Sequence, residues 1–388
     1  MNNKNKIQGF FLISLLALAL ITSLVTGGVP VSTPRAFDTD EQDTLHVGFD
    51  MPDGTYGQNS EQTVSAAKNA SYKDLKLYPG GLPFGVKFYT DGLIVIGFSD
   101  IEDRNGRSNP AYDAGLREKD VITKINGKPA VGVSQLTEEV EKASGGEITL
   151  TCKRSGRDYV VHVTPKYSET EGRYRTGLLI RDSGAGIGTV TFIDPESLSF
   201  GGLGHGICDG DTGELIPMDR GSVLDVTISG ITKGASGAPG EIKGYFGSNK
   251  TGSLVCNTAC GVYGTLASLP EGLPEGPLPI ATRDELREGD AYIYCTLDGS
   301  GPCKYTVSIS EINRSANGNK CFTVKVTDPA LIEKTGGIVR GMSGSPIVQN
   351  GKLVGAVTHV LVNDPTSGYG IFIENMLGAA EMPQQRAA

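Results

Sequence analysis

The sequence predicts a mainly β protein, and three observations support this fold class. Its 388 residues include 54 glycines, which are typical of the many turns that connect short strands. Apolar and polar residues alternate in segments such as Val223–Ile228 and Tyr305–Ile309, as in strands with one buried face. The length is sufficient for about two or three domains with a sizeable core.

The first residues predict an uncleaved signal anchor over residues 1–28. Lys4 and Lys6 precede an apolar run from Phe10 to Val25, and no clean cleavage site follows it. Because the basic end stays in the cytoplasm, we expect the anchor to attach the chain to a membrane, with the remainder outside. Residues 29–76 are polar and lack periodicity, which predicts a flexible linker.

Residues 77–166 alternate predicted strands with two helical stretches. A short helix at Ala111–Ala114 ends before Gly115, and the strand after it runs into an Asn-Gly turn. The run from Asn109 to Gly127 resembles the PDZ domain pattern. This resemblance implies a PDZ domain over 77–166 that binds peptides by adding a strand to a sheet edge.

The PDZ resemblance also implies a loop whose backbone N–H groups receive a peptide carboxylate. The matching residues are Gly81, Leu82, Pro83 and Phe84. Since proline has no N–H, one donor is missing from this loop, and we expect weak binding of free peptide C-termini.

The strongest chemical signal is the run Gly341-Met342-Ser343-Gly344-Ser345-Pro346. It precedes a hydrophobic strand, an Asn-Gly turn and a second strand. A nucleophilic serine requires a tight turn with small neighbours, whose N–H groups face the developing oxyanion. The pattern resembles that of trypsin-like proteases, so we expect Ser343 as nucleophile and the N–H groups of Gly341 and Ser343 as oxyanion donors.

A second run, Gly234 to Pro239, satisfies the same six-residue pattern around Ser236. It lacks the long strand, turn and strand that follow Ser343. We therefore predict Ser343, not Ser236, as the nucleophile.

Four histidines could supply the general base. His205 stands between glycines at a predicted turn, where an imidazole can reach a substrate. His46 falls in the polar linker and His162 in a predicted PDZ strand. His359 follows the hairpin and is expected in the core or at its rim. We therefore predict His205 as the base.

An orienting carboxylate should complete the site. Asp328 ends a predicted strand before a proline, and Asp225 lies inside an apolar strand where it would need a partner. Asp209 is close to His205 along the chain, as in a turn cap. These residues alone leave the choice between Asp328 and Asp225 open.

Composition excludes several kinds of partner. The net charge is −9 and no run of Lys or Arg could neutralise a row of phosphates, so no nucleic acid is expected. The seven cysteines are scattered, and the Cys256–Cys260 spacing has no second ligand pair. We expect neither a metal nor a cofactor, and the pairing of any disulfides stays open.

The chain as a whole resembles the stage IV sporulation protein B peptidase family of endospore-forming bacteria. The matching features are the anchor, the PDZ pattern and the runs Gly177–Thr189, Gly204–Gly206, Gly341–Pro346 and Asn363–Gly370. The resemblance implies a chymotrypsin-like double β-barrel at 167–378, followed by a tail at 379–388. Carried over residue by residue, the catalytic triad falls on His205, Asp328 and Ser343.

The same resemblance implies a signalling role between forespore and mother cell. The family cleaves itself and a regulator of an intramembrane protease, which activates the late mother-cell sigma factor. Self-cleavage would use the chain's own linker as substrate, between about Pro30 and Tyr78. Two alternatives stay open: a catalytically inactive PDZ scaffold, and a quality-control serine protease that degrades unfolded chains.

Overall fold

The computed structural model describes residues 72, 74–104 and 106–386. The anchor predicted at 1–28 lies outside the described residues, as does the linker predicted at 29–76 apart from its last few residues. Within the described part of the chain, no helix has the length and apolar character needed to cross a bilayer.

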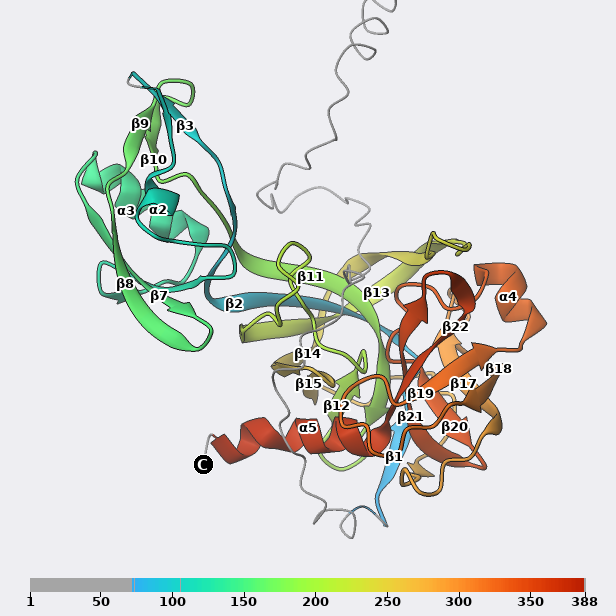
Figure 1. Ribbon diagram of the computed structural model, residues 1–388. Coiled ribbons are helices and arrows are strands. Elements are labelled where there is room, and N and C mark those ends of the chain that lie inside the picture. The colour runs from blue at the N-terminus through green and yellow to red at the C-terminus, as the bar shows by residue number, and fades with distance from the viewer. Residues whose placement is uncertain (1–71, 73, 105, 387–388) are drawn as a thin grey trace, which may run out of the picture. The chain divides into compact units, whose positions relative to one another are not determined.

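Six strands close into a first barrel, because β11 pairs with both β12 and β2 (Figure 1). In ring order they are β11 (Leu178–Ile193), β12 (Ser199–Gly202), β15 (Gly261–Leu266), β14 (Glu241–Thr258), β13 (Met218–Thr232) and β2 (Pro83–Phe98). Two short strands, β1 (Lys76–Pro79) and β16 (Leu278–Pro279), extend the sheet beside β11. Phe84, Phe88 and Phe200 are buried in the core of this barrel.

A second closed barrel follows in the chain. In ring order its strands are β17 (Gly289–Thr296), β18 (Pro302–Ser310), β19 (Phe322–Val326), β22 (Asp364–Phe372), β21 (Lys352–Leu361) and β20 (Pro346–Gln349). Asn350 and Gly351 turn the chain between β20 and β21 with φ of 52° and 72°, as the Asn-Gly signal predicts. The two barrels confirm the predicted double β-barrel.

The inserted module between β2 and β11 has its own hydrophobic core, which includes Leu93, Leu116, Leu136 and Leu178. Its sheet contains β5 (Val121–Ile125), β6 (Lys128–Pro129), β7 (Ile148–Arg154) and β8 (Arg157–Val163). Two further strand pairs are β3 (Ile101–Asp103) with β4 (Gly106–Ser108), and β9 (Lys166–Ser168) with β10 (Arg173–Arg175). The helices are α2 (Pro110–Asp113) and α3 (Val133–Ala143). This PDZ-like module, residues 93–181, carries the helices and strands that the PDZ pattern predicts.

Local signals set the ends of these elements. The side chain of Asn109 accepts a hydrogen bond from the Tyr112 amide and so caps α2, with Pro110 at the first helical position. Asn126 and Gly127 have φ of 48° and 77°, which gives the tight turn between β5 and β6.

Strands β2 and β11 each run through both the first barrel and the PDZ-like module. In β2, Pro83–Tyr89 pair with the second half of β11 and Gly85–Thr90 lie along β13, whereas Leu93 and Ile94 pair with β5. At the start of β11, Leu178–Arg181 pair with the module end of β2. Lys76–Thr90 therefore belong to the first barrel, and the module occupies about 93–181 instead of the predicted 77–166.

Two helices of the second barrel were not expected from the sequence. Helix α4 (Pro329–Thr335) begins directly after Asp328, and α5 (Ile373–Arg386) continues through most of the predicted tail. Met376 and Ala379 on α5 are buried in the core of the second barrel. The prediction of a frayed segment from 379 is therefore wrong up to Arg386.

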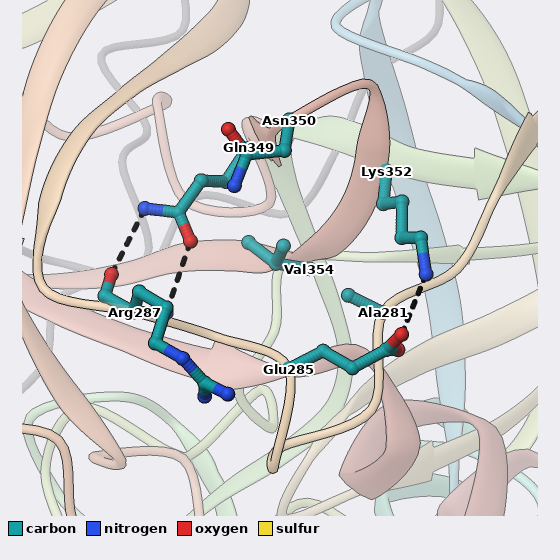
Figure 2. A pocket seen from close by; sticks show the side chains of 7 residues that line it. All are labelled: Ala281, Glu285, Arg287, Gln349, Asn350, Lys352 and Val354. Atoms are coloured by element: carbon teal, nitrogen blue, oxygen red, sulfur yellow. Dashed lines mark hydrogen bonds and ion pairs between the residues drawn. The ribbon is translucent and has the colours of Figure 1, made fainter.

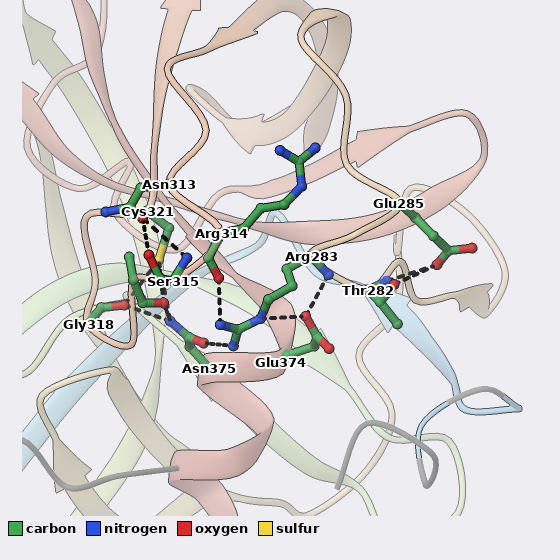
Figure 3. Close-up of polar contacts among 11 residues, drawn as sticks. Thr282, Arg283, Glu285, Asn313, Arg314, Ser315, Gly318, Cys321, Glu374 and Asn375 are labelled. Atoms are coloured by element: carbon green, nitrogen blue, oxygen red, sulfur yellow. Dashed lines mark hydrogen bonds and ion pairs between the residues drawn. The ribbon is translucent and has the colours of Figure 1, made fainter. Parts of the chain in front are cut away.

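Polar contacts fix the start of α5 (Figure 3). Glu374 Oε2 accepts a hydrogen bond from the Arg283 amide at 2.6 Å, and Arg283 Nη2 donates to Asn375 Oδ1 at 2.8 Å. Asn375 Nδ2 donates to the carbonyl oxygens of Ala316 and Gly318. The helix thereby holds the loop before β19 in place, and the next residue of that loop, Asn319, contacts the site described below.

Candidate active site

Ser343 stands on a tight turn between α4 and β20, which we call the nucleophile turn (residues 340–345). Gly341 and Gly344 on either side of it have φ of 96° and 94°, in the left-handed region that glycine adopts readily. The Ser343 hydroxyl donates to the carbonyl oxygen of Thr358 at 2.7 Å. The Thr358 hydroxyl in turn donates to the Asn319 carbonyl oxygen at 2.8 Å.

The predicted oxyanion donors lie in this turn. Among the described residues, the N–H groups of Gly341 and Ser343 have no backbone acceptor, whereas the amide of Met342 donates to the Val339 carbonyl. A substrate oxygen could therefore receive hydrogen bonds from Gly341 and Ser343 without displacing an existing backbone partner.

His205 lies on the loop after β12 and is buried, with 3% of its surface exposed. Its Nδ1 is 2.9 Å from the Gly206 carbonyl oxygen. A carbonyl oxygen can only accept, so Nδ1 carries the proton and Nε2 is left as the proton acceptor. This is the tautomer that a general base for a serine hydroxyl requires.

The loop of His205 is packed against the strands that flank Ser343. The Leu203 amide lies 2.5 Å from the place where a side-chain carbon on Gly344 would stand. Gly204 is also close to Thr358, whose methyl carbon is 2.9 Å from the place where a side-chain carbon on Gly204 would stand. The two segments that carry the predicted base and nucleophile therefore meet between the barrels.

A second histidine accompanies His205. The ring centroids of His205 and His359 are 5.0 Å apart, and neither nitrogen of His359 has a hydrogen-bond partner among the described residues. Burial lowers the pKa of His359 strongly, and the neighbouring His205 lowers it further. The prediction that His359 lies in the core or at its rim is consistent with this position, but its contact with His205 was missed.

Burial also sets the charge state of the predicted base. It lowers the pKa of His205 below the ordinary value of 6.5, and the hydrogen bond to Gly206 opposes this only in part. Protonated His205 cannot accept a proton, so activity is lost as the pH falls through this lowered pKa. We expect the acid limb of kcat/KM to lie below pH 6.5, as measured with a peptide substrate. A limb at or above pH 6.5 would contradict this.

The structure does not bring Asp328 to His205. Its carboxylate caps α4, where it accepts hydrogen bonds from the amides of Ala330 and Leu331, and it also accepts one from Thr306. Asp225 is bonded to the amide and side chain of Asn249 instead. In the described conformation neither candidate carboxylate orients the imidazole, and the Gly206 carbonyl occupies that place.

We predict that Asp328 acts mainly on stability. Asp328→Ala removes the cap and should lower the free energy of unfolding by about 1 kcal/mol, whereas asparagine caps helices as well as aspartate does. Asp328→Asn should therefore unfold like wild type and keep most of its turnover. Denaturant unfolding and peptide hydrolysis check both statements. A severe loss of turnover in a stably folded Asp328→Asn would instead support the triad that the family resemblance implies.

The second serine motif has a different position. Gly234–Pro239 forms most of the connection between β13 and β14, and the Ser236 hydroxyl donates to the Asn363 carbonyl at 2.9 Å. The amide of Gly234 donates to the Thr335 carbonyl. These contacts attach the exposed turn to the second barrel, and no histidine of the described residues is hydrogen-bonded to Ser236.

The predicted carboxylate loop is not at a peptide groove. The Gly81 amide donates to the Val190 carbonyl, and the Val190 amide donates to the Leu82 carbonyl. Pro83 begins β2, and Phe84 is 2% exposed in the core of the first barrel. The assignment of Gly81, Leu82, Pro83 and Phe84 to peptide binding is therefore wrong, because their backbone belongs to the first barrel.

One open pocket of about 330 Å³ lies at the turn between β20 and β21 (Figure 2). Its lining includes the ion pair of Lys352 with Glu285, and Gln349 is bonded to the backbone of Arg287. None of the predicted site residues lines it. In the described part of the chain, no three metal-ligating side chains are grouped as a metal site would require.

Comparison with known proteins identifies the family. The family model described as SpoIVB peptidase S55 matches residues 172–377, which is more than half of the chain. Zinc metalloprotease RasP of Shouchella clausii is 37% identical over 60 residues, which is 16% of this chain and 14% of that protein. Serine protease HTRA1 of Xenopus laevis is also 37% identical over 60 residues, or 16% and 13% of the two chains. The chain therefore spans less than a fifth of the length of these relatives.

Solved structures give weaker likenesses. The PDZ domain of the SdrC-like protein from Listeria monocytogenes matches with a TM-score of 0.19 and 19% identity, over 23% of this chain and 87% of that one. The active form of the Rv3671c protease from M. tuberculosis matches with a TM-score of 0.27 and 14% identity, over 52% and 74%. The family assignment thus depends on the match over 172–377, and this chain belongs to the SpoIVB peptidase S55 family.

Proposed function

We propose that this chain is a signalling endopeptidase of sporulation, in which Ser343 is the nucleophile and His205 the general base. The observation that carries the proposal is the arrangement at the nucleophile turn. Among the described residues, the N–H groups of Gly341 and Ser343 have no backbone acceptor, and the loop packed against the turn holds His205 with its proton on Nδ1.

In the proposed reaction, the Ser343 hydroxyl leaves the Thr358 carbonyl and gives its proton to His205 Nε2 as its oxygen attacks the substrate carbonyl carbon. The N–H groups of Gly341 and Ser343 stabilise the oxyanion that forms. Protonated His205 then donates to the leaving amine, and water hydrolyses the acyl-enzyme by the same steps in reverse. Hydrogen bonding of Nδ1–H to the Gly206 carbonyl keeps the imidazole in the required tautomer.

The substrate is proposed to be a regulator of an intramembrane protease, cleaved between forespore and mother cell. Membership of the family supports this role, and the apolar run in residues 1–28 supports a membrane anchor. The PDZ-like module supports recognition of an extended peptide segment.

Self-cleavage is part of the proposal, and the packing of the segment around β1 supports a cut on its N-terminal side. Tyr72 and Leu77 are buried in the core of the second barrel, and β1 pairs with β11 and β16. A cut within this segment would remove a paired strand, so the cut is proposed before Tyr72, in residues that lie outside the described part.

Expressed with residues 1–71, wild type should therefore yield a shortened form that leaves the membrane fraction. Ser343→Ala should stay full length, because shortening needs the nucleophile. Mass spectrometry of both proteins checks this prediction. Identical shortening of the two in a host without other candidate proteases would contradict it.

Labelling of the purified protein with a fluorophosphonate tests the catalytic proposal directly. Wild type should form one covalent adduct on Ser343, and Ser343→Ala none. Failure of wild type to label would favour the inactive scaffold. Rapid turnover of denatured casein, without preference for any sequence, would favour a quality-control protease.

A further inference from the structure

Strand β11 fastens the nucleophile turn by three hydrogen bonds. The Thr189 hydroxyl donates to the Gly341 carbonyl at 2.8 Å, and the Thr189 amide donates to the Ser343 carbonyl at 3.0 Å. The Thr191 hydroxyl donates to the Gly344 carbonyl at 2.8 Å. Among the described residues, Thr189 is thus the one that donates to the turn from both its hydroxyl and its amide. The two hydrogen bonds reach the residues on either side of Met342.

We propose that Thr189 is a positioning residue for the peptidase reaction, which holds the nucleophile turn in the conformation that leaves the oxyanion donors available. The proposal rests on the proposed function, since it concerns the rate of the reaction at Ser343. A residue of the first barrel would thus hold the conformation of a turn that belongs to the second barrel.

The argument follows from the planarity of the peptide bond. The C=O of one residue and the N–H of the next point in opposite directions, so an acceptor or donor at one end orients the other. Thr189 holds the Gly341–Met342 plane through its hydroxyl and the Ser343–Gly344 plane through its amide. These planes alternate along the turn with the two planes that present the Gly341 and Ser343 N–H groups.

The other two planes are held at their carbonyl ends. The Arg340 carbonyl accepts from the Ile242 amide at 2.8 Å, and the Met342 carbonyl accepts from the Ser345 amide at 2.9 Å. The N–H groups of Gly341 and Ser343 are therefore directed away from these acceptors. The Gly341–Met342 plane is joined to the two donor planes through ψ of Gly341 and φ of Met342, so loss of its restraint would loosen the constraint on both donors.

The Thr189 hydroxyl and the Met342 amide, which donates to the Val339 carbonyl, resist rotation of this plane from its opposite ends, and the hydroxyl contact, at 2.8 Å, is the shorter of the two. Thr189 is buried, with 3% exposure, so water does not replace a lost hydroxyl at low cost. Glycine at position 341 permits several backbone conformations, and its own conformation gives little resistance. Valine at 189 would keep the volume and remove only the donor to Gly341.

The experiment compares Thr189→Val and Thr189→Ser with a matched control, Thr296→Val. Thr296 is also buried, and its hydroxyl also donates to a glycine carbonyl, that of Gly81, at 2.8 Å. In the part of the chain that the structure describes, no hydrogen bond joins Thr296 to the nucleophile turn. Each full-length protein is assayed for kcat and KM on a peptide, for the rate of fluorophosphonate labelling, and for amide hydrogen exchange over residues 338–346.

We expect Thr189→Val to lower kcat and the labelling rate about tenfold or more, within the range for a weakened oxyanion site, with KM nearly unchanged. Thr189→Ser keeps the donor and should restore most of the rate. Thr296→Val should lose stability comparable to that of Thr189→Val and keep its kcat. Exchange over 338–346 should rise in Thr189→Val alone.

Several results would overturn the proposal. They are a kcat within about twofold of wild type in Thr189→Val, equal losses in Thr296→Val, or no rescue by serine. If wild type itself proves inert, the proposed function fails, and hydrogen exchange alone decides the role of Thr189. Unchanged exchange over 338–346 in Thr189→Val then counts against it, and faster exchange supports it.

Discussion

Replacing Ser343 by alanine is expected to abolish peptide-bond cleavage while leaving the fold intact. The substitution removes the nucleophile, and loss of a nucleophilic serine commonly lowers kcat by roughly four to six orders of magnitude. The substitution also removes the hydrogen bond of the hydroxyl to the Thr358 carbonyl, whose loss costs about 1 kcal/mol. Hydrolysis of a peptide substrate and thermal unfolding of the same preparation measure both effects.

Ser236→Ala is the matched control, since it makes the same change in the second copy of the motif. Ser236 is exposed, and its hydroxyl is bonded to the Asn363 carbonyl. We expect its activity to stay close to that of wild type. An inactive Ser236→Ala together with an active Ser343→Ala would reverse the assignment of the nucleophile.

Gly344→Ala should have the second largest effect, on both activity and stability. A side-chain carbon at Gly344 would stand 2.1 Å from the Thr189 carbonyl oxygen and 2.5 Å from the Leu203 amide nitrogen. Both are backbone atoms of the first barrel, so relief of the clash requires the nucleophile turn to shift away from it. We expect a loss of about 3 kcal/mol or more in the free energy of unfolding, and activity too low to measure.

The second motif again provides the control, because Gly237 follows Ser236 as Gly344 follows Ser343. Gly237 also has a positive φ, of 77°, but a side-chain carbon there meets nothing within 4 Å. Gly237→Ala should therefore cost only the left-handed backbone term of about 1–2 kcal/mol and keep its activity. Equal effects of the two alanines, measured by denaturant unfolding and peptide hydrolysis, would refute the packing argument.

Features that depend on neighbouring residues in the chain were predictable from the sequence. The helix near Ser134–Ala143 and the turn at Asn126-Gly127 appear where the pattern places them, because helical periodicity, here with Leu136 and Val140 buried, and turn geometry are local properties. The turn around Ser343 and the hairpin after it follow the same logic. The fold class followed from these local signals together with the family resemblance.

Features that depend on distant residues were not predictable. The expected carboxylate loop at Gly81–Phe84 is part of the first barrel, because β2 finds its partners in β11 and β13, about a hundred residues away. The alternation of apolar and polar residues along β2 is the same whether this strand belongs to a PDZ domain or to the first barrel, so it does not distinguish the two. The contact of His205 with His359 likewise depends on how the two barrels meet.

The residues around Asp328 also carry a helix signal that the prediction of a catalytic carboxylate did not include. An aspartate directly before a proline, with a glycine eight residues later, is typical of a short helix with its cap, and α4 has this sequence. The family resemblance directed attention to catalysis at Asp328, whereas the helix signal indicates a cap. Both are compatible with the sequence, and only the contacts of the carboxylate distinguish them.

The passage of β2 and β11 through two hydrophobic cores has a consequence for the order of folding during synthesis. Residues 93–181 form one continuous stretch, so the PDZ-like module can be completed before β12 to β15 have been made. Its pairing of Leu178 with Phe98 already brings β2 and β11 together, and after two register shifts the same two strands pair Thr189 with Pro83. The entropy cost of closing the loop between β2 and β11 is thus met early. The later strands of the first barrel then add to a β2–β11 pair that has already formed. We therefore expect the module to fold before the barrel that positions Ser343 is complete.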